Sequence, residues 1–350
     1  MDASGSPPSA VSDVSSGEDA HSGKDANAQE TPDVPTDAHR TGTVTRSTGS
    51  WYDVRVEDET VAARVRGKFR LEETDVTNPV AVGDRVTLRM NEDDGTGLIV
   101  DIHERQNKLS RRAAGRRTGQ EHVIVANIDR AWAVQSLRMP RLNTGFIDRF
   151  IVSAELQDLP AGLIINKVDL MEPEDEAEIE ALQGVYNDLG YPVRVTSATE
   201  GTGLDALEDA FRDNVNAITG PSGAGKSSLL NALDPALDIE TGAVSEKTQK
   251  GKHTTTFAEL HPLSFGGYVV DTPGIREFGI LALHPADLAH FFVEFIPYLD
   301  ACKFQDCTHD HEPGCAVKDA VDTGDIHEMR YENYLSILYS LAAGEEGSGR

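Results

Sequence analysis

The stretch GPSGAGKSS, residues 220–228, decides the fold of the central part of the chain. It matches the phosphate-binding pattern G-x-x-x-x-G-K-[ST], and it follows an apolar segment and opens an amphipathic one, as this pattern requires. The glycines let the backbone fold around a phosphate, so that N–H groups and the start of a helix face its negative charge. The alternative is a glycine turn before an ordinary helix. The residues predicted to bind phosphate are Gly220, Pro221, Ser222, Gly223, Ala224, Gly225, Lys226, Ser227 and Ser228.

Residues in and after this loop also predict a magnesium ion that accompanies the nucleotide. Lys226 can reach the terminal phosphates, and the hydroxyl of Ser227 can ligate Mg2+. The motif DTPG, residues 271–274, follows an apolar segment. Its Asp271 can hold the same ion through a water molecule, and the N–H of Gly274 can meet a γ-phosphate. Ser227 and Asp271 are therefore the expected magnesium ligands.

The motif NKVD, residues 166–169, predicts that the base is guanine. Asp169 would accept hydrogen bonds from the N1–H and the exocyclic amine of guanine, a pair of donors that adenine lacks. A buried carboxylate left unpaired by the wrong base costs binding energy, which gives selectivity. This disfavours the alternative of a P-loop ATPase or small-molecule kinase. The expected guanine pocket comprises Asn166, Lys167, Asp169, Ser197 and Ala198.

The order of the motifs is unusual. In an ordinary GTPase the phosphate loop comes first and N-K-x-D near the end, whereas here NKVD precedes the phosphate loop and DTPG comes last. The order predicts a circularly permuted P-loop GTPase, in which the chain runs from DTPG straight into a C-terminal segment. Strands are expected at 130–134, 162–165, 193–196, 215–219 and 268–270, and also at 122–126. Helices at 146–156, 174–189, 204–212 and 225–233 would cover both faces of a mostly parallel sheet.

Three cysteines close together near the C-terminus predict a metal site. The pattern C-x4-C-x-H-x5-C supplies three thiolates and one imidazole, which suits a closed, tetrahedral, structural zinc site. The expected ligands of this single Zn2+ are Cys302, Cys307, His309 and Cys315, with His311 as the rival for the nitrogen position. The alternative is a set of unligated cysteines beside a surface histidine.

Composition limits the partners. Asp and Glu number 59 against 32 Lys and Arg, a net charge of −27, so any contact with RNA must be local. The acid excess indicates a salt-rich cytoplasm, because at about 1 M salt the Debye length is roughly 3 Å and repulsion is screened. The alternative is an acidic protein of a mesophile. The N-terminus lacks a signal-peptide pattern and no apolar run reaches about 20 residues, so we expect a cytoplasmic protein without membrane contact. We also expect it to be a monomer.

Changes in composition and pattern predict a multidomain α/β chain. Short alternating runs at 52–56, 61–66, 85–89 and 98–102 favour a small barrel, with the OB-fold as the best match. Trp51 and Tyr52 are its candidate stacking residues, or else core. The expected segments are a disordered acidic tail at 1–40, an OB-fold β-barrel at 41–105, a basic linker at 106–120, the permuted GTPase at 121–284, a helical zinc-binding domain at 285–343 and a disordered tail at 344–350.

The linker region contains the strongest basic cluster of this acidic chain. It is either a solvated linker or an arm that follows RNA phosphates. Its members are Arg105, Lys108, Arg111, Arg112, Arg116 and Arg117.

The permuted order, the loop GPSGAGKSSL, the segment KGKHTTT at 250–256, DTPGIREF and the cysteine pattern together resemble the RsgA family, the bacterial small ribosomal subunit biogenesis GTPases, over about residues 43–340. The resemblance implies an N-terminal OB-fold, a permuted GTPase and a C-terminal zinc domain. It also implies a role in late maturation of the 30S subunit, with binding to 16S rRNA and GTP hydrolysis that the particle stimulates.

The hydrolytic residues are implied by the resemblance alone. Ile275 occupies the position where ordinary GTPases place a water-orienting glutamine. The resemblance makes His253 the candidate that activates water, with Thr254 or Thr255 closing on magnesium and the γ-phosphate. The alternative for His253 is an exposed loop histidine. Ile275 also keeps open a different function, a GTP-gated RNA or ribosome clamp whose hydrolysis is vestigial.

Overall fold

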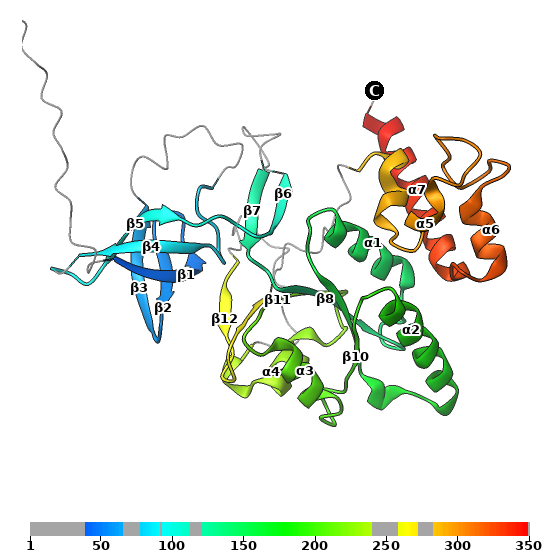
Figure 1. Ribbon diagram of the computed structural model, residues 1–350. Helices are drawn as coiled ribbons and strands as arrows, with labels where there is room; N and C mark the ends of the chain where they lie inside the picture. The colour runs from blue at the N-terminus through cyan, green and yellow to red at the C-terminus, as the bar shows by residue number, and fades with distance from the viewer. Residues whose placement is uncertain are drawn as a thin grey trace, which may run out of the picture. The chain divides into compact units, whose positions relative to one another are not determined.

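The computed structural model describes residues 39–65, 78–91, 93–112, 121–239, 258–271 and 283–348. Three architectural parts follow one another along these residues, namely a β-barrel, an α/β sheet and a helical C-terminal part (Figure 1). Among the described residues, none of the helices combines the length and the apolar character needed to cross a bilayer.

The N-terminal part is a closed barrel of five strands in the order β1-β2-β3-β5-β4. Buried and exposed residues alternate along the strands, so that every second side chain enters the barrel core. The expected OB-type barrel is thus confirmed. The strands are β1 (His39–Ser47), β2 (Tyr52–Val56), β3 (Glu59–Val65), β4 (Arg85–Met90) and β5 (Gly97–Ile102).

Strand β1 begins earlier than the sequence predicts. His39 and Arg40 belong to the expected tail, but they pair with Arg89 and Leu88 of β4. Arg40 also lies 3.1 Å from the carboxylate of Glu59. The barrel therefore begins at His39 and not at residue 41. The reason is the pairing of β1 with β4, which local composition does not reveal. The rest of the expected tail lies outside the described residues.

The expected basic linker contains a strand. β6 (Lys108–Arg112) pairs antiparallel with β7 (Glu121–Ala126), and the two form a separate two-stranded sheet. The prediction that 122–126 joins the large parallel sheet is therefore wrong. Leu109 and Val125 pair with each other and are buried, which explains why this basic stretch pairs with a strand.

The central part is a six-stranded sheet in the order β10-β9-β8-β11-β13-β12. All neighbouring pairs are parallel except the edge pair of β12 with β13, and every residue of β9 is buried. This confirms the mostly parallel sheet, which is apolar on both faces. The strands are β8 (Arg130–Ser136), β9 (Ala161–Asn166), β10 (Val193–Val195), β11 (Val215–Thr219), β12 (Leu260–Pro262) and β13 (Tyr268–Asp271).

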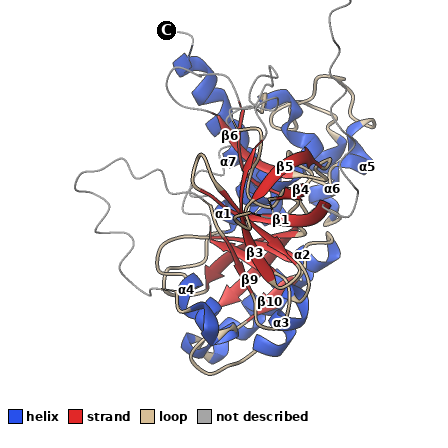
Figure 2. Ribbon diagram, turned by 90° about the vertical axis from the view of Figure 1, so that its left-hand side faces the viewer, coloured by secondary structure: helices blue, strands red, loops and turns tan. Residues whose placement is uncertain are grey.

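Helices cover both faces of this sheet, and they surround the strands in Figure 2. Ile147 and Ile179, from α1 and α2, belong to the apolar cluster on one face, and Leu207 and Leu229, from α3 and α4, belong to that on the other. The expected two-sided covering is thus confirmed. The helices are α1 (Thr144–Glu155), α2 (Glu176–Asp188), α3 (Leu204–Phe211) and α4 (Lys226–Leu233).

The C-terminal part is helical, and its small apolar core also includes Val152 of helix α1. Its elements are the 3-10 helix η9 (Pro285–Phe291) and the helices α5 (Ile296–Leu299), α6 (Ala316–Thr323) and α7 (Glu328–Ser348). Helix α7 runs through residues 344–348, which the sequence predicts as part of a disordered tail. Phe292, Phe295 and Tyr334 pack against one another at centroid distances of 4.9–5.2 Å. Cys315 and Val317 belong to the same apolar cluster, so this core and the cysteine site are continuous.

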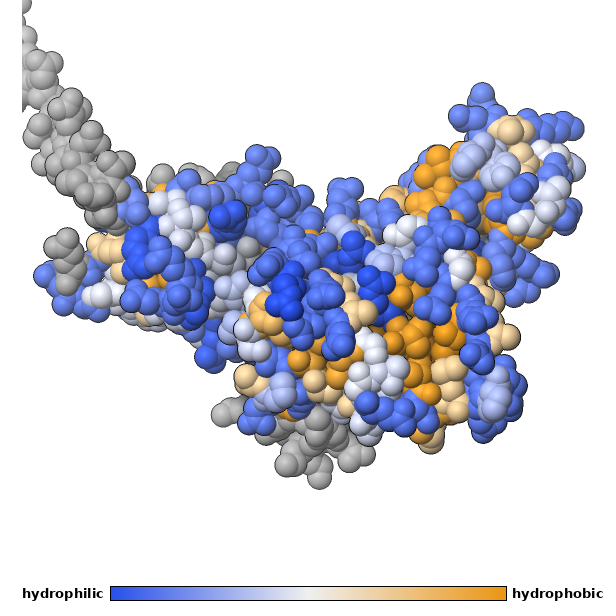
Figure 3. All heavy atoms as spheres, turned by 60° about the horizontal axis from the view of Figure 1, so that its bottom comes forward, coloured by the Kyte–Doolittle hydropathy of each residue, from blue (hydrophilic) through white to orange (hydrophobic). Residues whose placement is uncertain are grey.

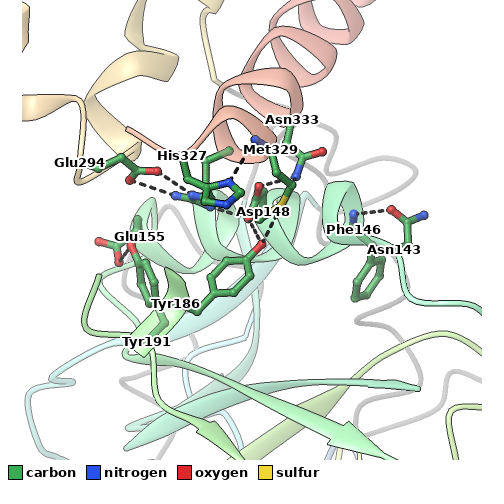
Figure 4. A network of polar contacts seen from close by, with 11 residues as sticks. Asn143, Phe146, Asp148, Glu155, Tyr186, Tyr191, Glu294, His327, Met329 and Asn333 are labelled. Atoms are coloured by element: carbon green, nitrogen blue, oxygen red, sulfur yellow. Dashed lines mark hydrogen bonds and ion pairs between the residues drawn. The ribbon is translucent and has the colours of Figure 1, made fainter. Parts of the chain in front are cut away.

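A buried ion-pair network joins helix α7 to helix α1 (Figure 4). Arg330 is fully buried, and its guanidinium donates to Asp148 and, at 2.6 and 3.1 Å, to Glu294. Asp148 also accepts from the Tyr186 hydroxyl and the Asn333 amide, each at 2.6 Å. Burial raises the pKa of Asp148, and the Arg330 charge opposes that rise. The cation is thus held between two carboxylates with most of its donors satisfied.

Replacing Arg330 by methionine is expected to destabilise the fold strongly. The change leaves Asp148 and Glu294 beside each other without a cation, which costs about 3–5 kcal/mol in buried pairs. Urea unfolding, followed by circular dichroism, measures the loss. The matched control is Arg149→Ala, which removes an exposed contact of 2.8 Å with Ser340 between the same two helices and should shift the midpoint little. Equal midpoints for the two variants would show that the network contributes no more than a surface contact.

The surface is largely hydrophilic on the face drawn in Figure 3, with apolar residues exposed between the hydrophilic ones. Acidic residues outnumber basic ones by 59 to 32, so repulsion between surface charges falls as salt rises. Greater stability in molar salt therefore stays a prediction.

Candidate functional site

The phosphate loop, residues 220–228, joins the end of β11 to the start of α4. Three of its glycines have positive φ angles, 149° at Gly220, 85° at Gly223 and 88° at Gly225. A Cβ atom at Gly220 would lie 2.2 Å from the Val134 carbonyl oxygen, and one at Gly225 would lie 2.6 Å from the Asn166 amide nitrogen. The conformation of this loop therefore requires glycine at these positions.

Lys226, the first residue of α4, turns back over the loop. Its Nζ donates to the carbonyl oxygens of Gly220 at 2.8 Å and Pro221 at 3.1 Å. The ammonium group is thus held at the mouth of the loop by neutral acceptors. A phosphate oxygen is a stronger acceptor for this ammonium group than a carbonyl oxygen, because it carries a negative charge.

The NKVD segment lies directly against the phosphate loop. Asn166, at the end of β9, donates to the Ala224 carbonyl at 3.0 Å and accepts from the Thr196 hydroxyl at 3.2 Å. Lys167 donates to the carbonyls of Gly223 at 2.5 Å and Met139 at 2.7 Å. Two motifs that are more than 50 residues apart in the sequence are thereby joined into one site.

Asp169 and Ser197 meet where β9 and β10 end. The Ser197 hydroxyl donates to Asp169 Oδ1 at 2.5 Å, and this hydrogen bond lowers the pKa of the Asp169 carboxyl. The carboxylate is therefore ionised at neutral pH and ready to accept donors from a ligand. Ala198 follows and packs, partly buried, against the apolar cluster of α3 and α4. The structure brings these expected guanine-site residues together.

The expected hydrolytic residues are not placed. His253, Thr254, Thr255 and Gly274 lie outside the described residues, and only the backbone of Asp271 is described. That backbone ends β13 in register with Ile218 of β11, the strand that leads into the phosphate loop. Parallel strands end at the same edge of a sheet, so Asp271 and the phosphate loop share this edge.

Cys302, Cys307, His309 and Cys315 form a compact cluster, with one ligand atom of each within 4.8 Å of the others. Nδ1 of His309 lies 3.5 Å from the Cys302 sulfur and 3.4 Å from the Cys315 sulfur, and these sulfurs are 4.0 Å apart. Zinc–sulfur bonds of about 2.3 Å in a tetrahedron put the ligand atoms about 3.8 Å apart. The donor set and its spacing fit a tetrahedral zinc ion.

The surroundings of the cluster favour His309 over His311. His309 is buried, and burial lowers its pKa, which keeps the imidazole neutral and able to bind a metal. The Tyr331 hydroxyl donates to the His309 carbonyl at 2.8 Å and so fixes its backbone. The side chain of His311 is 80% exposed and lies beside Asp310 instead. No sequence signal pointed to Tyr331, because its partner is a backbone atom.

Two candidates for RNA contact have structural roles instead. Arg105 forms a two-pronged pair with the fully buried Asp84, at 2.7 and 2.8 Å, so it braces the barrel and is not part of a free basic arm. Tyr52 is buried in the barrel core. Trp51 is only partly buried, and the Arg64 guanidinium lies 3.9 Å from the centre of its ring. Arg116 and Arg117 lie outside the described residues.

Comparison with known proteins identifies the family. The model of the RsgA GTPase family matches residues 102–281, and that of the RsgA N-terminal domain matches residues 41–99. The chain belongs to the RsgA GTPase family. An RsgA relative from Bacteroides thetaiotaomicron, named small ribosomal subunit biogenesis GTPase RsgA 2, is 40% identical over 305 residues, which cover 87% of this chain and 98% of the relative.

Solved structures agree with the RsgA assignment. The crystal structure of YjeQ from Thermotoga maritima matches with a TM-score of 0.73 and 37% identity, covering 87% of this chain and 99% of that one. The crystal structure of YloQ, described as a circularly permuted GTPase, matches with a TM-score of 0.68 and 30% identity, covering 91% and 98%. These matches confirm the permuted GTPase fold and the resemblance found in the sequence.

Proposed function

We propose that this RsgA-family GTPase acts in late maturation of the 30S ribosomal subunit, where it binds the particle and its 16S rRNA and leaves when GTP is hydrolysed. The observation that carries the proposal is the contact of NKVD with the phosphate loop through Asn166 and Lys167. This contact supports one pocket that holds base and phosphates of the same nucleotide. The ribosomal partner is supported by the names of the relatives.

In this pocket the base and the phosphates are held by different segments. The ionised Asp169 accepts from guanine N1–H and the exocyclic amine, and Ser197 holds the carboxylate in place. The backbone N–H groups of the phosphate loop and Lys226 hold the phosphates, as in other helix-start anion sites. Ser227 and Asp271 would hold Mg2+, which neutralises phosphate charge when bound.

Hydrolysis requires a residue other than Ile275 to orient water, because its side chain is apolar. We assign this role to His253, with Thr254 or Thr255 closing on magnesium and the γ-phosphate. Such a loop must be ordered before it can act, so turnover by the chain alone should be slow. A GTP-gated clamp without productive hydrolysis is the second candidate, favoured by Ile275.

The cysteine cluster is proposed to hold a structural Zn2+. All four coordination positions are taken by Cys302, Cys307, His309 and Cys315, which leaves none open for a substrate. When bound, the ion would cross-link residues 302–315, the segment that leads into helix α6 at Ala316. We also propose that the chain works in the cytoplasm, in keeping with a ribosomal partner, and that it works as a monomer.

The test is single-turnover GTP hydrolysis with and without purified 30S subunits, in 50 mM and in molar potassium chloride. We expect 30S to raise the rate at least about tenfold, because ordering a catalytic loop by a partner gives large accelerations in other GTPases. 50S subunits serve as the control. Binding to 30S without any acceleration at either salt concentration would contradict the proposal and favour the clamp.

A further inference from the structure

The loop between β8 and α1, residues 137–142, contacts both halves of the nucleotide site, although no motif marks it. The loop is closed on itself, since the Leu142 N–H donates to the Leu137 carbonyl at 3.0 Å. Leu137 is buried in the core of the α/β part, which ties the loop to the sheet. The loop is therefore anchored to the sheet, and neighbouring segments can be held in place by contacts with it.

On one side, Arg138 of the loop binds the segment that follows NKVD. Arg138 Nε lies 2.6 Å from Asp175 Oδ2, and Nη2 lies 3.1 Å from Asp175 Oδ1. Its third nitrogen, Nη1, lies 2.9 Å from Glu172 Oε1. Asp175 in turn accepts from the Glu172 N–H at 2.9 Å, so the turn and the guanidinium form one hydrogen-bonded unit. Arg138 lowers the pKa of the Asp175 carboxyl, which keeps the pair charged.

On the other side, the loop meets the start of NKVD and the phosphate loop. The Met139 carbonyl accepts from Lys167, whose ammonium also donates to Gly223 of the phosphate loop. A Cβ atom at Gly223 would lie 3.8 Å from Pro140 Cδ. Residues 167–175 are thus fixed to loop 137–142 at both ends, and Asp169 lies between the two attachment points.

We propose that Arg138 is a positioning residue for guanine recognition, which holds the segment carrying Asp169 at the correct distance from the phosphate loop. The inference rests on the proposed guanine site. The Arg138 side chain is one-third exposed, and an ion pair of such exposure contributes little to the free energy of unfolding. Its guanidinium nevertheless makes three contacts with one turn, which indicates that it positions this turn. Binding groups must be held within about 0.5 Å of the productive geometry, and Arg138 is placed to hold the Asp169 segment there.

The test compares Arg138→Ala and Arg138→Lys with wild type in the full-length chain, by displacement of a fluorescent GDP with GDP, IDP, ADP and pyrophosphate. IDP lacks the exocyclic amine, so the ratio of IDP to GDP dissociation constants reports how well Asp169 is aimed. We expect Arg138→Ala to weaken GDP about tenfold and to lower that ratio at least about threefold, while pyrophosphate binding stays unchanged. Arg138→Lys should be intermediate, because an ammonium cannot make the two-pronged contact.

Two comparisons separate positioning from a general effect. The control Arg212→Ala removes an arginine of similar exposure that pairs with Glu208 on α3 and should leave all four affinities unchanged. The double variant Arg138→Ala with Asp175→Asn should bind GDP no more weakly than Arg138→Ala alone, because the two side chains act as one unit.

The inference is overturned if Arg138→Ala keeps the wild-type ratio of IDP to GDP affinity, or if it weakens pyrophosphate as much as GDP. If the wild-type chain binds GDP and ADP equally well, the proposed guanine site itself is wrong, which is a different failure. The two failures are therefore distinguishable in one set of measurements.

Discussion

Replacing Asp169 by asparagine is expected to convert the chain from a guanine-nucleotide binder into one that prefers xanthine nucleotides. The carboxylate accepts two hydrogen bonds from guanine, and each bond to a charged group contributes about 1.5–3 kcal/mol. GDP affinity should therefore fall by about a hundredfold or more. The asparagine amide adds a donor, and xanthine carries at C2 an oxygen that can accept it, so XDP affinity should rise.

Displacement assays with GDP, XDP and ADP measure this change. Asp188→Asn, which makes the same substitution at an exposed position near the end of α2, is the matched control and should leave all three affinities unaltered. Equal loss of GDP and XDP binding in Asp169→Asn would mean that the carboxylate supports the fold of the pocket and does not select the base.

Loss of the cysteine cluster is expected to unfold the C-terminal part. Cys315 is almost completely buried and belongs to the apolar core of residues 283–341. Structural zinc contributes about 10–16 kcal/mol to the folding of zinc-finger peptides at pH 7, so a domain of this size should lose its structure without the ion. Cys315→Ser should lower the zinc content from about one ion per chain to almost none and remove hydrogen-exchange protection from α6 and α7.

The two histidines provide the control for this experiment. His309→Ala should behave like Cys315→Ser, whereas His311→Ala, which removes an exposed imidazole outside the cluster, should retain zinc and protection. Retention of zinc in His309→Ala together with its loss in His311→Ala would show that the fourth ligand is assigned wrongly.

The features that the sequence predicted well are those whose chemistry is local. A phosphate loop needs glycines and a lysine within a few residues, so GPSGAGKSS can be recognised without knowledge of its partners. The cysteine spacing is informative for the same reason. The alternation of β3 and the unbroken apolar run of β9 likewise identify a barrel strand and a buried parallel strand.

The features that the sequence did not predict depend on pairing with other segments of the chain. Leu109 is the single apolar residue of Lys108–Arg112, and the strand conformation of this segment depends on its pairing with β7. Arg105 looks like part of a basic arm until Asp84 is placed next to it. Arg330 and Asp148 are 182 residues apart, and neither residue type normally indicates a buried position. Long-range pairing of this kind leaves no periodic pattern to detect.

We propose that one guanine nucleotide spans the NKVD segment and the phosphate loop. A crystal structure of the chain with GDP tests it directly. We predict that an Asp169 carboxylate oxygen lies about 3 Å from guanine N1 and that the β-phosphate of the same molecule contacts the phosphate loop and Lys226. A bound GDP whose phosphates occupy that loop while its base lies away from Asp169 would show that the NKVD segment does not bind the base.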